Sequence, residues 1–187
     1  RDRFLKPGGT IIPASIELRV APVEAPDLYR RVVDVWHQQI HGIDLTPLRS
    51  LAVNQKYPGR FDAGQLLAPP APLSSVALAT VTAPHISGTA RVHAARTGIA
   101  HGICGSFVTT LAEGVTIGNV PGDSRTTNFA QAFYPIDTPH AVGAGDDISI
   151  AIDSFDAIQT RWQMTIASQG GTRCFDQSTF HSTPVRL

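Results

Sequence analysis

The chain has 187 residues, which is enough for one domain with a substantial hydrophobic core. Hydrophobic residues make up 42% of it and charged residues only 16%, so composition excludes a disordered tail. Fifteen basic residues balance fifteen acidic ones, and we therefore expect no nucleic acid and no anionic membrane surface as a partner. The sequence also has no apolar run long enough to span a bilayer.

The two cysteines, Cys104 and Cys174, do not form a C-x-x-C pair and cannot build a disulfide framework. A reducing compartment, the cytoplasm, is therefore the expected location. The chain begins with Arg1, and its one methionine is Met164. We expect it to be a piece of a longer polypeptide.

The first half of the chain predicts a short strand followed by helix. Residues 1–5 run into the helix-stopping stretch Lys6–Gly9, and alternation over residues 16–20 then predicts a strand. Residues 26–40 place apolar side chains at helical spacing, with Gly42 in the position of a C-cap. Thr46-Pro47 predicts a second helix start, and residues 54–72 form a connection rich in Pro and Gly.

From residue 74 onward the pattern is almost entirely that of short strands separated by turns. The expected strands are Ser74–Thr82, Thr89–Ala95, Gly98–Leu111, Thr126–Ile136, Ile148–Asp153, Arg161–Ala167 and one near Thr179. This spacing predicts a mainly β fold, an antiparallel β-barrel or sandwich.

Three local motifs have plain structural explanations. His37 and His41 have the spacing of a zinc helix, but Gln38 stands where the catalytic Glu would be. Cys104 lies in a strand-like apolar segment that lacks a nucleophile signature, which favours burial. The G-x-G at residues 143–145 precedes a strand rather than a helix, which predicts a hairpin turn. We expect no catalytic, cofactor-binding or metal-binding residue in this chain.

Three segments, in order, resemble conserved stretches of the protein arginine methyltransferases. Residues 1–13 (RDRFLKPGGTIIP) resemble the end of that family's cofactor-binding domain. Residues 36–45 (WHQQIHGIDL) are similar to the W-x-x-V-Y-G-F-D-M stretch that leads into the family's dimerisation arm. Residues 127–133 (TNFAQAF) are similar to the family's T-H-W-K-Q-x-x-F loop.

The resemblance implies that the chain is the C-terminal substrate-binding and dimerisation barrel of an S-adenosylmethionine-dependent methyltransferase, inert alone. Residues 1–13 would end a missing Rossmann-type domain, and residues 14–187 would form the barrel. The full-length enzyme would bind S-adenosylmethionine through that missing domain, form a homodimer, and methylate a protein, a peptide or a small molecule. The predicted arm (residues 41–67) would hold the second subunit through its apolar side chains, which are Ile43, Leu45, Leu48, Leu51, Tyr57 and Phe61.

The resemblance also implies that Thr127, Asn128 and Phe129 line the substrate pocket. The family has His and Trp where this chain has Asn128 and Phe129. Asparagine cannot carry a charge near neutral pH, so it cannot form the family's His–Asp ion pair. Phenylalanine keeps an aromatic wall but loses the indole N–H. These two differences put arginine in question as the acceptor.

Two alternatives remain open from the residues. A free-standing β-rich module of jelly-roll type, binding carbohydrate or protein, explains the strands and the neutral charge. A zinc or cysteine hydrolase rests only on the weak His37–His41 and Cys104 motifs.

Overall fold

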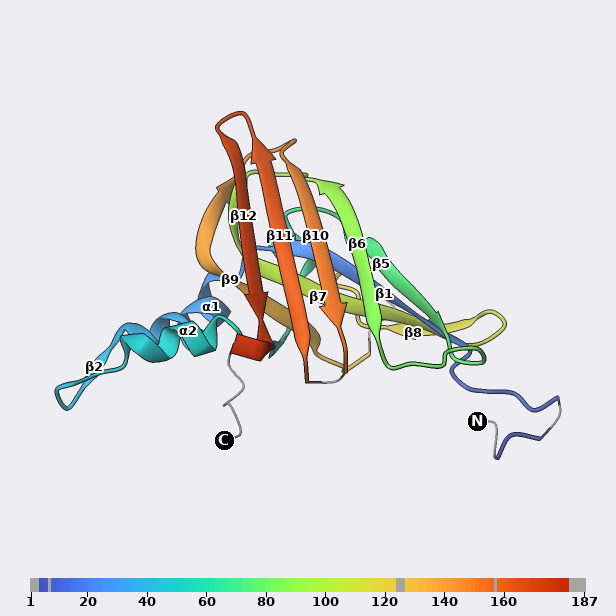
Figure 1. Ribbon diagram of the computed structural model, residues 1–187. Helices are drawn as coiled ribbons and strands as arrows, with labels where there is room; N and C mark the ends of the chain where they lie inside the picture. The colour runs from blue at the N-terminus through green and yellow to red at the C-terminus, as the bar shows by residue number, and fades with distance from the viewer. Residues whose placement is uncertain (1–3, 7, 124–126, 157, 182–187) are drawn as a thin grey trace.

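The computed structural model describes residues 4–6, 8–123, 127–156 and 158–181, and its strands form two main antiparallel sheets (Figure 1). The strands are β1 (Ser15–Val23), β2 (Gln39–Ile40), β3 (Ile43–Asp44), β4 (Tyr57–Gly59), β5 (Ala71–Ala77), β6 (Ile86–His93), β7 (Gly98–Ala112), β8 (Val115–Gly118), β9 (Gln131–Val142), β10 (Asp147–Ser154), β11 (Thr160–Ser168) and β12 (Gly171–Ser178). The helices are α1 (Pro26–Val32) and α2 (Arg49–Ala52), with 3-10 turns η1 (Asp34–His37), η2 (Thr46–Leu48), η3 (Ala63–Gln65) and η4 (Thr179–His181).

The larger sheet has the order β4-β9-β7-β1-β5, and the long strand β7 is its centre. The first half of β7 pairs with β9, its middle pairs with β1, and its last residues pair with β8. The smaller sheet has the order β12-β11-β10-β6 and lies in front of the larger one in Figure 1. The expected mainly β, antiparallel barrel or sandwich is therefore confirmed.

Glycine lets the two sheets come together at the β5–β6 side. A Cβ atom on Gly88 of β6 would lie 2.1 Å from the carbonyl oxygen of Leu73 in β5. No larger residue fits at that approach without moving a backbone.

The molecule has two hydrophobic cores, one on each face of the larger sheet. The lumen core between the sheets includes Ile103, Ile136 and Trp162, each fully buried. The indole N–H of Trp162 donates to the carbonyl of Pro135 at 2.7 Å, so the ring is buried without an unpaired donor. The second core lies under α1 and contains Tyr29 and Phe133.

The prediction of one helix over residues 26–40 is wrong. Helix α1 ends at Val32, a 3-10 turn follows, and Gln39 and Ile40 form a strand. The indole N–H of Trp36 bonds to the carbonyl of Val32 at 3.2 Å. Gly42, expected as a helix cap, instead follows His41 in a two-residue hairpin turn in which both have positive φ angles.

The remaining differences concern strand boundaries. Strand β9 begins at Gln131 rather than at residue 126, which lies outside the described residues. The last strand, expected near Thr179, is β12, which ends at Ser178 and is followed by the 3-10 turn η4. Strands β7, β10 and β11 match their predicted ranges within one residue. Residues 1–3 and 7 of the opening motif lie outside the described part of the chain.

Candidate functional site

The loop before β9 carries the three predicted pocket residues, Thr127, Asn128 and Phe129. Thr127 fixes its start, because both its backbone N–H and its hydroxyl donate to the carbonyl of Gly118, at 2.7 and 3.0 Å. Asn128 is exposed, and its carbonyl accepts from the Arg60 guanidinium at 3.0 Å. Phe129 is 60% exposed, with its ring 5.9 Å from that of Phe107.

Two buried amide side chains hold this loop against the barrel. The Asn119 side-chain oxygen accepts from the N–H of Phe107 at 2.7 Å, and its NH₂ group donates to the carbonyl of Ala130 at 2.8 Å. The Gln131 NH₂ group donates to the carbonyl of Asn119 at 2.6 Å, and its oxygen accepts from the N–H of Phe61 at 3.2 Å. Both loop ends are thus fixed through paired, buried polar groups.

The loop therefore offers an exposed aromatic face and a neutral amide on a rigid base. Such groups pack against a bound molecule and orient it by hydrogen bonds. They do not exchange protons near neutral pH. The arrangement suits one wall of a binding site that other residues complete.

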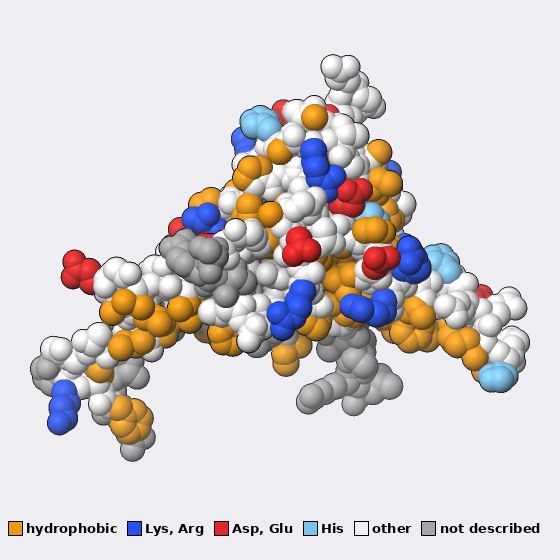
Figure 2. Space-filling model, turned by 180° about the vertical axis from the view of Figure 1, so that it is seen from behind, with side chains coloured by type: hydrophobic (Ala, Val, Ile, Leu, Met, Phe, Trp, Pro, Cys, Tyr) orange, Lys and Arg blue, Asp and Glu red, His pale blue; other side chains and the backbone are white. Residues whose placement is uncertain are grey.

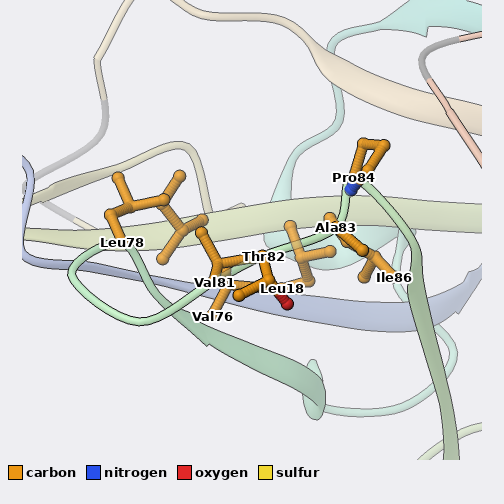
Figure 3. Close-up of a pocket in the computed structure, with 9 residues that line it drawn as sticks. Leu18, Val76, Leu78, Val81, Thr82, Ala83, Pro84 and Ile86 are labelled. Atoms are coloured by element: carbon orange, nitrogen blue, oxygen red, sulfur yellow. The ribbon is translucent and has the colours of Figure 1, made fainter. Parts of the chain in front are cut away.

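An apolar groove lies where β1 and β5 extend beyond the smaller sheet (Figure 3). Its volume is about 440 Å³; β1 contributes Leu18, β5 contributes Val76, and Leu78 directly follows β5. The segment between β5 and β6 contributes Val81, Thr82, Ala83 and Pro84, all of which are labelled in Figure 3. The chain enters β1 beside this groove, because the N–H of Leu78 donates to the carbonyl of Ala14 at 3.0 Å.

A segment at the opposite end of the molecule projects away from the barrel (Figure 1). This projecting segment (residues 39–51) consists of the β2–β3 hairpin, η2 and the start of α2. Its large apolar side chains are exposed, Ile43 to 63%, and the others are Ile40, Leu48 and Leu51. Leu45 is partly buried. Hydrophobic side chains gather on this end of the molecule, at the right in Figure 2.

The base of the projecting segment is bonded to an irregularity in β9. The register between β7 and β9 shifts between Ala100 and Gly102. The Tyr29 hydroxyl donates to the carbonyl of Ile136 at 2.9 Å. The Arg49 guanidinium donates to the Tyr29 hydroxyl at 3.0 Å and also to the carbonyl of Asp137. A bulge leaves carbonyls without a ladder partner, and here these two side chains satisfy them.

Two residues of the predicted arm lie in the barrel rather than in the projecting segment. Phe61 is buried in the core under α1, with its ring 5.9 Å from that of Phe133. Tyr57 is partly buried in β4, and its hydroxyl donates to the carbonyl of Ala52 at 2.9 Å. Packing within the chain accounts for both residues.

The weak motifs do not form a catalytic centre. His37 lies in η1 and His41 in the hairpin turn, so they do not share a helix. Cys104 is buried in β7, and burial raises the pKa of its thiol to about 12, as the prediction of a structural cysteine requires. Residues 143–146 form a turn before a strand, in which the Asp146 carboxylate accepts from the N–H of Gly143 at 2.8 Å, but the prediction of a hairpin is wrong because β9 and β10 belong to different sheets.

Across the described ranges, no group of three or more His, Cys, Asp or Glu side chains is placed to hold a metal ion. In the same ranges no helix is long and apolar enough to cross a membrane.

Sequence reasoning missed Asn119, Gln131 and Arg60, which position the loop. Asn119 follows β8 and precedes Val120-Pro121-Gly122, where an asparagine indicates a turn rather than a bridge between strands. Gln131 lies in the resembling motif, but only contacts distant in sequence give it a role.

A family model for the arginine methyltransferase oligomerization subdomain matches residues 14–166. Curated relatives include a probable protein arginine N-methyltransferase 6 of Arabidopsis thaliana, 44% identical over 52 residues, or 28% of this chain and 12% of that protein. A probable histone-arginine methyltransferase CARM1 of Oryza sativa subsp. indica is 36% identical over 78 residues, or 37% of this chain and 15% of that protein. The chain thus matches only a small part of these relatives' length.

Solved structures share the fold over nearly the whole chain. One is a chain of the Trypanosoma brucei PRMT1 enzyme-prozyme heterotetrameric complex with AdoHcy, with a TM-score of 0.74 and 13% identity. The match covers 91% of this chain and 58% of that one. Another is Arabidopsis thaliana protein arginine methyltransferase 10, with a TM-score of 0.70 and 14% identity. That match covers 95% of this chain and 63% of the other.

These comparisons do not favour a free-standing jelly-roll module. The family model spans most of the chain, and both solved relatives have the same barrel. The chain belongs to the arginine methyltransferase oligomerization subdomain family, and its sheets form a C-terminal barrel like that of the protein arginine methyltransferases.

Proposed function

We propose that this chain is the substrate-binding and dimerisation barrel of an S-adenosylmethionine-dependent methyltransferase resembling the protein arginine N-methyltransferases. The match of the family model over residues 14–166 carries the proposal. The chain would be inactive alone, because methyl transfer requires cofactor and acceptor to be held together in one geometry. A domain preceding residue 14 would bind S-adenosylmethionine.

Thr127, Asn128 and Phe129 would form one wall of the acceptor site. The fixed loop ends and the exposed Phe129 ring support this assignment, since a wall must be rigid and accessible. The acceptor would be a protein, a peptide or a small molecule. A neutral Asn128 would orient a neighbouring group through a hydrogen bond, without an ion pair.

The full-length protein would be a homodimer, held by the projecting segment. The family description as an oligomerization subdomain supports self-association. The exposed Ile43, Leu48 and Leu51 support this segment as the contact, because apolar side chains grouped on one surface indicate an interface. A two-fold contact of this kind closes on itself and limits the assembly. The free thiols of Cys104 and Cys174 support a reducing, cytoplasmic location.

The test is methyl transfer by the complete gene product that contains this chain. Loss of one neutral hydrogen bond costs about 0.5–1.5 kcal/mol, so Asn128→Ala should slow turnover about two- to tenfold. Phe129→Ala should slow it more, because it removes the wall that positions the acceptor. Ile99→Ala, which removes an exposed apolar side chain at the far end of β7, is the control and should leave turnover unchanged.

Two outcomes would contradict the proposal. Wild-type turnover in both loop variants would mean that residues 127–129 are not part of the acceptor site. Calorimetric binding of S-adenosylmethionine to residues 1–187 alone would mean that the barrel itself holds the cofactor.

A further inference from the structure

The barrel lumen contains a cavity of about 230 Å³ beside the loop at residues 127–130. Its walls come from both sheets and are mostly apolar, and the main contributors are Leu18, Leu73, Ile86, Phe107, Tyr134 and Ile152. Leu18 and Ile86 also line the groove in Figure 3, so the cavity and the groove adjoin. The exposed Ala130 lies at its edge.

The cavity exists because small residues face the lumen at this end. Gly105, Ala130 and Ala132 all line it. A Cβ atom on Gly105 would lie 2.9 Å from Cε2 of Tyr134, so the tyrosine ring lies against the bare backbone there. The other side of that ring packs toward Trp162, with the ring centroids 5.5 Å apart. Tyr134 is thereby held in place as a wall of the cavity.

Tyr134 also brings a polar group to this apolar space. Its hydroxyl has no hydrogen-bond partner among the residues that the structure describes, whereas the Tyr29 and Tyr57 hydroxyls both donate to carbonyls. Burial raises the pKa of the Tyr134 phenol, so the hydroxyl stays protonated and can donate. The hydroxyl is not one of the fully buried side-chain atoms that lack a partner, so it is accessible to a bound molecule.

We propose that this cavity binds a single aromatic ring that carries one hydrogen-bonding substituent, such as a phenol. An apolar cavity of about 150 Å³ lined by Leu, Ile and Phe binds benzene, so 230 Å³ accommodates one ring with a substituent. The apolar walls provide most of the binding free energy, and the Tyr134 hydroxyl selects the polar substituent. The ring comes either from a free small molecule or from a tyrosine side chain of a polypeptide. The proposal concerns binding alone and is independent of methyl transfer.

The test uses 4-fluorophenol and fluorobenzene as probes, with binding followed by fluorine NMR on the 187-residue chain. Ala132→Leu fills the cavity from β9 and should abolish binding of both probes. Ala141→Leu makes the same change at an exposed position of the same strand and should leave binding intact. Tyr134→Phe should weaken 4-fluorophenol binding about two- to tenfold and leave fluorobenzene unchanged, since only the phenol loses a hydrogen bond.

A competition arm distinguishes the two sources of the ring. Displacement of 4-fluorophenol by the peptide Gly-Tyr-Gly supports a polypeptide side chain, and displacement by phenol but not by the peptide supports a free small molecule. Thermal melts establish that each variant is folded.

Three results would overturn the assignment. The first is no binding at millimolar probe, and the second is equal binding by Ala132→Leu and Ala141→Leu. The third is binding by the 187-residue chain that disappears in the complete gene product, because the cavity would then be filled by the rest of the protein.

Discussion

Replacing Asn119 by Ala should destabilise the barrel, although this residue lies outside the strands, directly after β8. The side chain is 2% exposed and bridges two backbone groups, the N–H of Phe107 and the carbonyl of Ala130. Alanine leaves both groups without these partners. An unpaired buried group costs about 1–3 kcal/mol, and this applies to the N–H of the partly buried Phe107, whereas Ala130 is exposed and water can replace the partner of its carbonyl. We therefore expect Asn119→Ala to lower the free energy of unfolding by about 1–3 kcal/mol.

Urea unfolding followed by tryptophan fluorescence measures this loss, because the buried Trp162 reports on the barrel. Asn128→Ala is the matched control, since it makes the same change at an exposed site in the neighbouring loop. It should alter the free energy of unfolding by less than about 0.5 kcal/mol. Equal effects of the two substitutions would refute the bridging role of Asn119 and the view that it fixes the loop.

Two further predictions concern barrel closure and pH. Gly88→Ala should lower the free energy of unfolding by about 1–3 kcal/mol, because the added Cβ would clash with the carbonyl of Leu73. Gly64→Ala, which has open space around it, is the control and should be neutral or slightly stabilising. Equal melting temperatures for the two variants would contradict this. Burial lowers the pKa of His101 below its usual 6.5, so the unfolded state binds more protons as the pH falls below that value. Unfolding measured between about pH 7 and pH 5.5 should therefore show stability falling more steeply in the wild type than in His101→Gln, and parallel curves would contradict this.

The sequence predicts the strands well where alternation is strong and the flanking turns are clear. Strands β10 and β11 are such cases, because their inward residues, including Ile150, alternate with mostly polar outward ones, whereas β7 is buried on both faces. The prediction of one helix over residues 26–40 was wrong because the apolar spacing of this segment also fits a short helix followed by a 3-10 turn and a hairpin. Local spacing does not decide between these structures, and tertiary contacts such as the Tyr29 bond to β9 do.

The candidate site was predictable only in part. The assignment of residues 127–129 to the substrate pocket follows from a resemblance between short motifs. The amides that fix the loop act through groups distant in sequence, as in the bond from Gln131 to the N–H of Phe61. The lumen cavity depends on small residues of different strands facing one another, such as Gly105 and Ala132. No periodicity in a single segment encodes either feature.

The molar mass of the complete gene product in solution, measured by light scattering, tests the central claim most directly. We expect a dimer for the wild type and a monomer for the double variant Leu48→Asp with Leu51→Asp, because two charges on the projecting segment would have to be buried without partners. Val115→Asp, an exposed apolar position on β8, should remain dimeric. A monomeric wild type, or a double variant that is still a dimer, would contradict the assignment of residues 39–51 as the self-association surface.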